Sequence, residues 1–140
     1  MDHRERITQR IDRLGDPNDP NTPRPLLTIE EFFEGNEYPG SIGCNLSPAP
    51  PPSRFYSLFK RIASRPNVKD IRVRITDFDD FDWPFSDTVY IMTSATVEEV
   101  GSWFDADLAP DEIWEGFHTG ETHEPYSTPS GTRPVAVWWD

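Results

Sequence analysis

The densest group of chemically useful side chains is a run of carboxylates, Asp-Phe-Asp-Asp-Phe-Asp. It places Asp77, Asp79, Asp80 and Asp82 within six residues. Hard cations such as Ca²⁺ and Mg²⁺ take oxygen ligands at this density. The run lacks the glycine and the distal glutamate of a calcium-binding loop, and in an extended segment neighbouring acids point to opposite faces. We interpret it as a solvated loop or a contact for a partner's arginines, with a metal site at Asp77 and Asp79 as the alternative.

Two histidines form a second candidate group. His118 and His123 lie five residues apart, with Glu121 and Glu124 close by. Zinc binds such side chains, but the spacing has no accompanying cysteine pair. The preferred interpretation is a glutamate-flanked surface pair. A metal-dependent enzyme that uses these histidines or the Asp77–Asp82 carboxylates stays open as an alternative.

Nucleophilic and cofactor chemistry have little support in the sequence. Cys44 is the single cysteine, so no disulfide forms within the chain. A lone cysteine in an apolar stretch, here SIGCNL, is more often a buried small hydrophobe than a nucleophile. The sequence contains no G-x-S-x-G, P-loop or G-x-G-x-x-G motif. We therefore predict no catalytic residue and no cofactor.

The charge of the chain is carried by its second half. Residues 1–66 hold nine acids and nine bases, whereas residues 67–140 hold sixteen acids and four bases, which accounts for the net charge of −12. Between Arg74 and Arg133 there are 14 acids and no lysine or arginine. A surface of this sign repels nucleic acid and anionic membranes and attracts a basic partner.

Aromatic residues lie among the acids, and one interpretation is that they anchor the acidic loop in the core. The other is that they mark where such a partner binds, because arginine pairs with carboxylates and stacks on rings. We therefore expect a non-enzymatic protein-binding module for a basic protein, of an immunity-like or regulatory kind. The expected contact residues are Asp79, Asp80, Asp82, Trp83, Asp111, Glu112 and Trp114. Two alternatives are that the acids only confer solubility, and that the chain self-associates through its basic N-terminal helix.

The elements that position these residues begin with an N-terminal helix. Residues 3–14 place apolar side chains at helical spacing, and the Pro- and Asn-rich segment 15–25 follows as a linker. We therefore divide the chain into an N-terminal helix with its linker, 1–25, and a single domain, 26–140. Within the domain, a capping box at Thr28 and Glu31 predicts a helix to about Glu34, and residues 52–65 form the clearest helix.

The remaining segments are mostly strands. Residues 68–78 alternate as a half-buried strand, 88–93 are apolar on both faces as in a central strand, and 134–140 form the last strand. Residues 41–46 are predicted as a short strand, residues from Thr96 as a capped helix, and 110–117 as another short helix. The predicted fold is α+β, with a three- or four-stranded mixed or antiparallel sheet and helices mainly on one face.

The length of 140 residues fits one domain. No apolar run approaches the roughly 18 residues of a membrane span. The first ten residues, MDHRERITQR, lack the apolar segment of a secretory signal, so the expected location is the cytoplasm.

Several segments carry a resemblance to known sequences: TIEEFFEGN, GSIGCNL, WPFSDTVYIMTS, LAPDEIWEGF and RPVAVWWD. They resemble segments of small, acidic, uncharacterised bacterial proteins, over roughly residues 26–140. That group has no established activity, so the resemblance implies no functional residue. The chain is similar to immunity proteins in composition and size.

Overall fold

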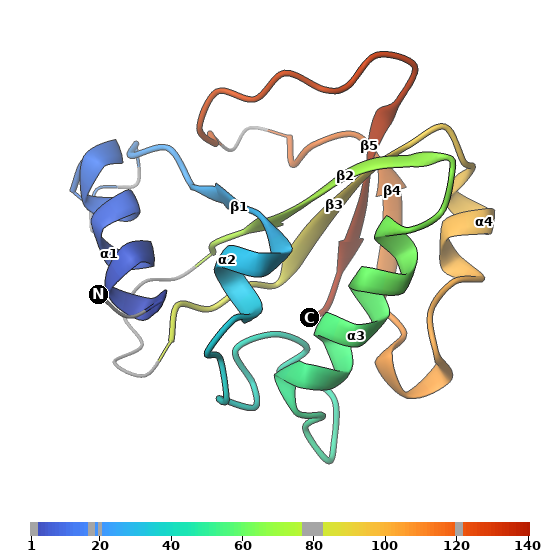
Figure 1. Cartoon of the computed structure of the whole chain (residues 1–140), viewed down its shortest axis with the longest axis horizontal. Helices are drawn as coiled ribbons and strands as arrows, with labels where there is room; N and C mark the ends of the chain where they lie inside the picture. Colours follow the sequence, from blue (N-terminus) through green and yellow to red (C-terminus); the bar gives the residue numbers. More distant parts are fainter. Residues whose placement is uncertain (1–2, 17–18, 20, 77–82, 120–121) are drawn as a thin grey trace.

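In the computed structural model, which describes residues 3–16, 19, 21–76, 83–119 and 122–140, five strands form one antiparallel sheet (Figure 1). Their order across the sheet is β1-β2-β3-β5-β4. The strands are β1 (Leu26–Leu27), β2 (Val68–Arg74), β3 (Thr88–Thr93), β4 (Glu112–Glu115) and β5 (Arg133–Trp138). The helices are α1 (His3–Leu14), α2 (Ile29–Phe33), α3 (Pro52–Ala63), α4 (Val97–Gly101) and the 3₁₀ helix η1 (Ala106–Leu108).

Strand β3 lies at the centre of the sheet, as its apolar sequence predicts. It covers the predicted residues Thr88–Thr93, and all six side chains are buried. Tyr90 pairs with Arg72 of β2 on one side and with Ala136 of β5 on the other. The predicted α+β fold is confirmed, and the sheet is antiparallel throughout the described residues.

The sheet has five strands, more than the three or four predicted. Strand β1 is only two residues long and was not predicted, and β4 lies where we predicted a helix over 110–117. The adjacent apolar residues Ile113 and Trp114 fit one side of a helix. They equally fit a strand that is covered on both faces, and pairing with Val137 and Ala136 of β5 selects the strand. Gly116, with φ +108°, follows the strand.

Segment 41–46 is also not a strand. It forms turns, with one isolated bridge between Ile42 and Ser86. Strand β2 ends at Arg74, four residues earlier than predicted.

The helices begin and end for identifiable local reasons. The predicted capping box of α2 is present: the Thr28 hydroxyl accepts from the Glu31 amide at 3.1 Å, and the Glu31 carboxylate accepts from the Thr28 amide at 2.9 Å. Helix α3 begins at Pro52, whose fixed φ suits the first turn, and it ends at Ala63, two residues before the predicted end. No helix within the described residues is long and apolar enough to cross a membrane.

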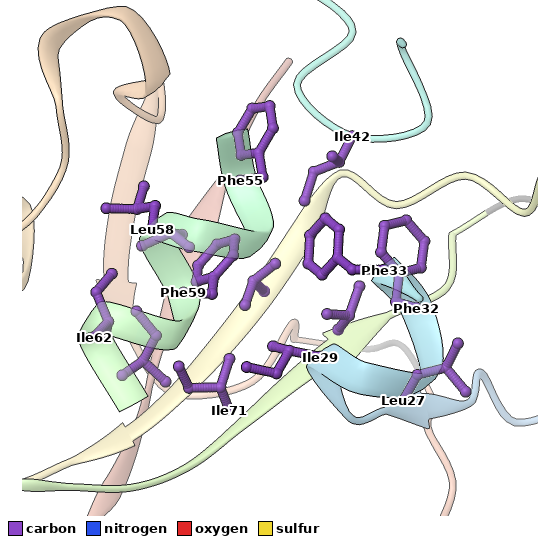
Figure 2. Close-up of a cluster of buried hydrophobic side chains, with 14 of the residues drawn as sticks. Leu27, Ile29, Phe32, Phe33, Ile42, Phe55, Leu58, Phe59, Ile62 and Ile71 are labelled. Atoms are coloured by element: carbon purple, nitrogen blue, oxygen red, sulfur yellow. The ribbon is translucent and has the colours of Figure 1, made fainter. Parts of the chain in front are cut away.

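Helices α2 and α3 pack on one face of the sheet. Figure 2 shows Phe55 and Phe59 of α3 lying in one cluster with Phe32 and Phe33 of α2, all of them buried. Helix α1 contributes Ile7 and Ile11 to the same core, together with Val73, Val89, Ile91, Val135 and Val137 of the sheet. Each such side chain stabilises the fold by roughly 1.5–3 kcal/mol when fully buried.

The second face of the sheet is covered by chain rather than by helices. Tyr90, Met92 and Ala136 form a smaller buried cluster with Leu26 of β1. Phe117 and Tyr126, from the segment between β4 and β5, pack against it, as does Trp114. Because both faces are covered, the central strand is apolar on both sides.

Candidate functional site

The expected partner-binding residues fall into three groups in the structure. Asp79, Asp80 and Asp82 lie outside the described residues, as does the metal candidate Asp77. Trp83 is buried, with 3% of its surface exposed, and its ring stacks on Tyr38 at a centroid distance of 6.2 Å. Its indole N–H has no hydrogen-bond acceptor among the described residues. The remaining three, Asp111, Glu112 and Trp114, come together at β4.

Strand β4 forms one edge of the sheet. Trp114 pairs with Ala136, and the Gly116 amide donates to the Pro134 carbonyl at 2.8 Å. Because hydrogen-bonding direction alternates along an antiparallel strand, Ile113 and Glu115 direct their backbone N–H and C=O groups away from β5. These outward groups have no hydrogen-bond partner in the part of the chain that the structure describes.

The side chains on this edge differ in how firmly they are held. The Asp111 carboxylate accepts from the Asn45 amide at 2.5 Å and from the Asp140 backbone amide at 2.8 Å. Glu115 forms an ion pair with Arg133, whose Nε lies 2.7 Å from Oε1. Glu112 is exposed and has no ion pair among the described residues. The Asp111 carboxylate is therefore fixed by hydrogen bonds and the Glu115 carboxylate is paired with an arginine. The Glu112 carboxylate has no such contact among the described residues.

Trp114 is half-buried on the second face of the sheet. Its ring meets the His118 ring at 5.1 Å, edge to face. The indole is therefore anchored while part of its surface stays accessible.

Arginines of the first half neutralise part of the acidic stretch. Arg54 binds the Asp107 carboxylate through two hydrogen bonds, of 2.7 and 3.1 Å, and Arg61 binds Asp105 at 3.0 Å. The guanidinium of Arg54 lowers the pKa of Asp107 below its usual value. The folded chain is therefore less uniformly acidic around η1 than the sequence suggests.

A polar cluster that the sequence did not predict lies at the start of β3. The Asp87 carboxylate accepts from the hydroxyls of Thr76 and Thr88, each at 2.8 Å. The Thr88 oxygen lies 2.7 Å from His118 Nε2. Since the single hydroxyl proton is donated to Asp87, Nε2 donates to Thr88 and carries the ring proton there. Thr88 is fully buried and held by both groups, so the cluster positions the segment after β4 on the sheet.

A sequence signal for this cluster existed in the polar residues of β3. Thr88 and Thr93 are polar positions in a strand that is otherwise apolar, and each hydroxyl is used internally. The groups that bind these two hydroxyls lie in other parts of the sequence. The threonines therefore indicated that hydrogen-bond partners must exist, and the sequence did not identify which residues they are.

The two histidines are held by different local contacts. His123 Nδ1 lies 2.8 Å from the Glu124 carbonyl oxygen, and its ring packs on Phe117 at 4.5 Å. The Nε2 atom of His118 is bonded to Thr88, as described above. Among the described residues, no three His, Cys, Asp or Glu side chains are grouped as a metal-binding site requires.

Cys44 is exposed, which corrects the prediction that it is a buried residue. It lies in the turns that replace the predicted strand 41–46. Partial burial is the main cause that raises the pKa of its thiol, and the nearby carboxylate of Asp87 adds to the effect. A raised pKa keeps the thiol protonated, which is the opposite of what a cysteine nucleophile needs.

Comparison with known sequences places the chain in a family. The model of the "Uncharacterized protein YfbO family" matches residues 2–137. The chain belongs to the YfbO family. The "Uncharacterized protein YfbO" of Escherichia coli (strain K12) is 49% identical to it over 136 residues, which is 97% of each chain. No solved structure matches the chain.

The YfbO family match extends beyond the expected resemblance. It includes residues 2–25, so α1 and the following linker belong to the shared sequence as well as the α+β domain. The resemblance to small uncharacterised bacterial proteins is thus confirmed, and it covers more of the chain than predicted.

Proposed function

We propose that this chain is a non-enzymatic protein-binding module that receives an extended, basic segment of a partner protein along strand β4. The proposal rests on one observation, the outward backbone N–H and C=O groups of Ile113 and Glu115. A strand edge of this kind can accept an extended segment as an additional strand of the sheet. Backbone hydrogen bonds then provide much of the affinity.

The charge of the edge supports a basic partner. Glu112 has no ion pair among the described residues, and Asp111 and Glu115 lie on the same short segment. An exposed ion pair contributes only about 0–1 kcal/mol to binding. These acids therefore contribute more to specificity and to the association rate than to affinity. Trp114 offers a ring on which an arginine of the added strand can stack.

The same acids disfavour a second copy of the chain as the added strand. Pairing of β4 with β4 brings two acidic segments together, each with the Glu112 carboxylate that has no ion pair among the described residues, and like charges across neighbouring strands are destabilising. Charged residues on an edge strand also protect a protein from such pairing. A basic segment removes this repulsion, so we propose it as the occupant.

Binding of this type suits an immunity-like inhibitor or a regulatory protein that neutralises a basic protein. We also propose that it acts in the cytoplasm, in keeping with a sequence whose single cysteine leaves no disulfide within the chain.

The backbone interaction can be tested separately from the charge. Glu115→Pro removes the outward N–H without removing a bond to β5, because that N–H faces away from the sheet. Glu115→Gln removes the same charge and keeps the donor. The experiment is affinity capture from the native host with an N-terminal tag, washed at low and high salt, using wild type and both variants.

We expect wild type to retain a basic protein that is lost at high salt, as screening predicts. Glu115→Gln should retain most of it, and Glu115→Pro should lose it, with both variants folded by circular dichroism. Retention of the same protein by Glu115→Pro would contradict strand addition. A bait that retains no basic protein at low salt would contradict the proposed function.

A further inference from the structure

A cavity of about 490 Å³, open to solvent, lies where the end of α3, the start of β2 and two turns meet. Its polar lining comes from Arg65, Asn67, Lys69, Ser94, Ser130 and Thr132. None of the described residues that line it carries a carboxylate. The lining is therefore basic, although the chain as a whole has a net charge of −12.

The two cations of the cavity differ from several arginines of the chain in their contacts. Arg54, Arg61 and Arg133 each bind a carboxylate of the chain. Arg65 and Lys69 form no ion pair among the described residues. Two positive charges therefore line the same hollow without an ion pair to a described carboxylate, which favours an anion there.

Arg65 is held by a ring rather than by an acid. Its guanidinium carbon lies 4.6 Å from the centroid of the Trp103 ring. Such stacking uses the face of the guanidinium and leaves the N–H donors in its plane free to bind an oxyanion through two parallel hydrogen bonds. The contact thus orients Arg65 without consuming its donors.

Lys69 lies at an irregularity of β2. The register of β2 against β3 shifts between Val68 and Asp70, as in a β-bulge, which redirects the side chain of the residue within it. The neighbouring Asn67 amide donates to Glu99 at 2.8 Å. This bond uses one of the two N–H donors of the Asn67 amide, and Arg65 and Lys69 are the charged groups of the lining.

The opposite wall is the turn before β5. The Thr132 amide donates to the Pro129 carbonyl at 3.2 Å, which closes the turn. Gly131 has φ +80° and no atom within 4 Å of the position of a Cβ, so a ligand can approach the backbone closely. Ser130 adds an exposed hydroxyl to this wall.

We infer that this cavity binds the phosphate group of a small phosphorylated molecule, with Arg65 and Lys69 as the charged contacts. Arginine and lysine together are common phosphate ligands, and hydroxyl groups complete such sites. The volume exceeds that of a phosphate ion and lies within the range of about 300–1,000 Å³ that is usual for small-molecule sites. This inference is independent of partner binding at β4.

The test is a titration of the isotopically labelled full chain with inorganic phosphate and, separately, with glucose 6-phosphate, followed by amide and indole NMR signals at low salt. We expect saturable shifts at Ser130–Thr132 and at the Trp103 indole. Arg65→Gln and Lys69→Gln should each weaken binding by about tenfold, the loss of one charged hydrogen bond. Lys60→Gln, the same charge change on α3, should not.

Tighter binding of the sugar phosphate would support a phosphorylated metabolite, and equal binding would support phosphate itself. Two results would overturn the inference. One is the absence of saturable shifts at the cavity with either probe. The other is equal weakening in Lys60→Gln, since a general charge effect would then account for the binding.

Discussion

The guanidinium of Arg10, in α1, binds the carboxylate of Glu124, which lies 114 positions further along the chain. The same guanidinium donates to both oxygens of Glu31, at 2.9 and 2.7 Å, and to the Leu26 carbonyl at 2.9 Å. Glu124 in turn accepts from the Leu26 amide at 2.7 Å. One arginine therefore connects α1, α2, β1 and the segment that covers the second face of the sheet.

Replacement of this arginine should destabilise the fold. We expect Arg10→Ala to lower the free energy of unfolding by about 2–3 kcal/mol, because it leaves two partly buried carboxylates without their cation. Urea denaturation measures the change. Arg13→Ala, on an exposed position of the same helix, should stay within about 0.5 kcal/mol of wild type. Equal losses in the two variants would show that α1 is held by its apolar side alone.

Two glycines offer a matched test of close packing. Gly43 has φ +65°, and a Cβ there would lie 2.6 Å from Phe55 Cζ, an atom of a buried ring. Gly40 has φ +91° and open space around it. We expect Gly43→Ala to lower the thermal midpoint clearly more than Gly40→Ala, by an amount that corresponds to about 1–3 kcal/mol of overpacking. Similar midpoints would show that Phe55 moves aside at little cost.

Trp139 is part of the buried core and also donates a hydrogen bond to a backbone carbonyl. It is fully buried, its Nε1 donates to the Leu108 carbonyl at 3.1 Å, and its ring meets Phe55 edge to face at 5.6 Å. Trp139→Phe should cost about 2–4 kcal/mol, from the cavity and the unsatisfied carbonyl together. Trp138→Phe, at a half-buried position, is the control in the same denaturation experiment. A smaller loss for Trp139 than for Trp138 would contradict the structure.

Stability at high pH should depend on Tyr126. Burial, and then the hydrogen bond that its hydroxyl donates to Asp70, raise the pKa of Tyr126 to about 12 from an ordinary value of 10.0. The unfolded chain therefore loses this proton first, and the free energy of unfolding falls as the pH rises from about 10 to 12.

Tyr126→Phe should make this alkaline loss shallower, measured as denaturation midpoints across that pH range. Tyr56, whose pKa is also raised to about 12, mainly by burial and then by Glu34, should behave in the same way. The double variant should therefore be the least sensitive to alkali. Parallel loss of stability in wild type and Tyr126→Phe would refute the assignment.

The spacing of apolar residues correctly predicted the helices and strands that have one apolar and one polar face. Ile71 and Val73 of β2 alternate with Arg72 and Arg74, and α3 carries Phe55, Phe59 and Ile62 along one side, so each pattern has one structural solution. The central position of β3 followed from six residues without a polar face.

Periodicity failed where tertiary pairing decides. The segment around Ile113 and Trp114 has two adjacent apolar residues between acids, a pattern that a helix and a doubly covered strand share. Strand β1 is too short for a pattern to be visible, because it consists of two leucines, one on each face of the sheet.

The candidate site was predicted only in part. Asp111, Glu112 and Trp114 lie within four residues of one another, so the sequence could place them together. Their position on an edge strand of the sheet depends on the strand order, which the sequence does not specify. The lining of the cavity for which we propose phosphate binding comes from three separated segments, 65–69, 94 and 130–132. Its signal is the absence of carboxylates among the lining residues, which becomes visible only after folding.

The position of β5 determines when the sheet can be completed during synthesis. It is the last strand in sequence, yet it lies between β3 and β4. While the ribosome adds residues 116–132, β4 therefore has no strand to pair with, and β3 exposes one hydrogen-bonding edge. Such transient edges are sites of aggregation. A chain that stops before Arg133 would keep that edge permanently, so shortened forms should be recovered in inclusion bodies, even though the segments that remain are unchanged.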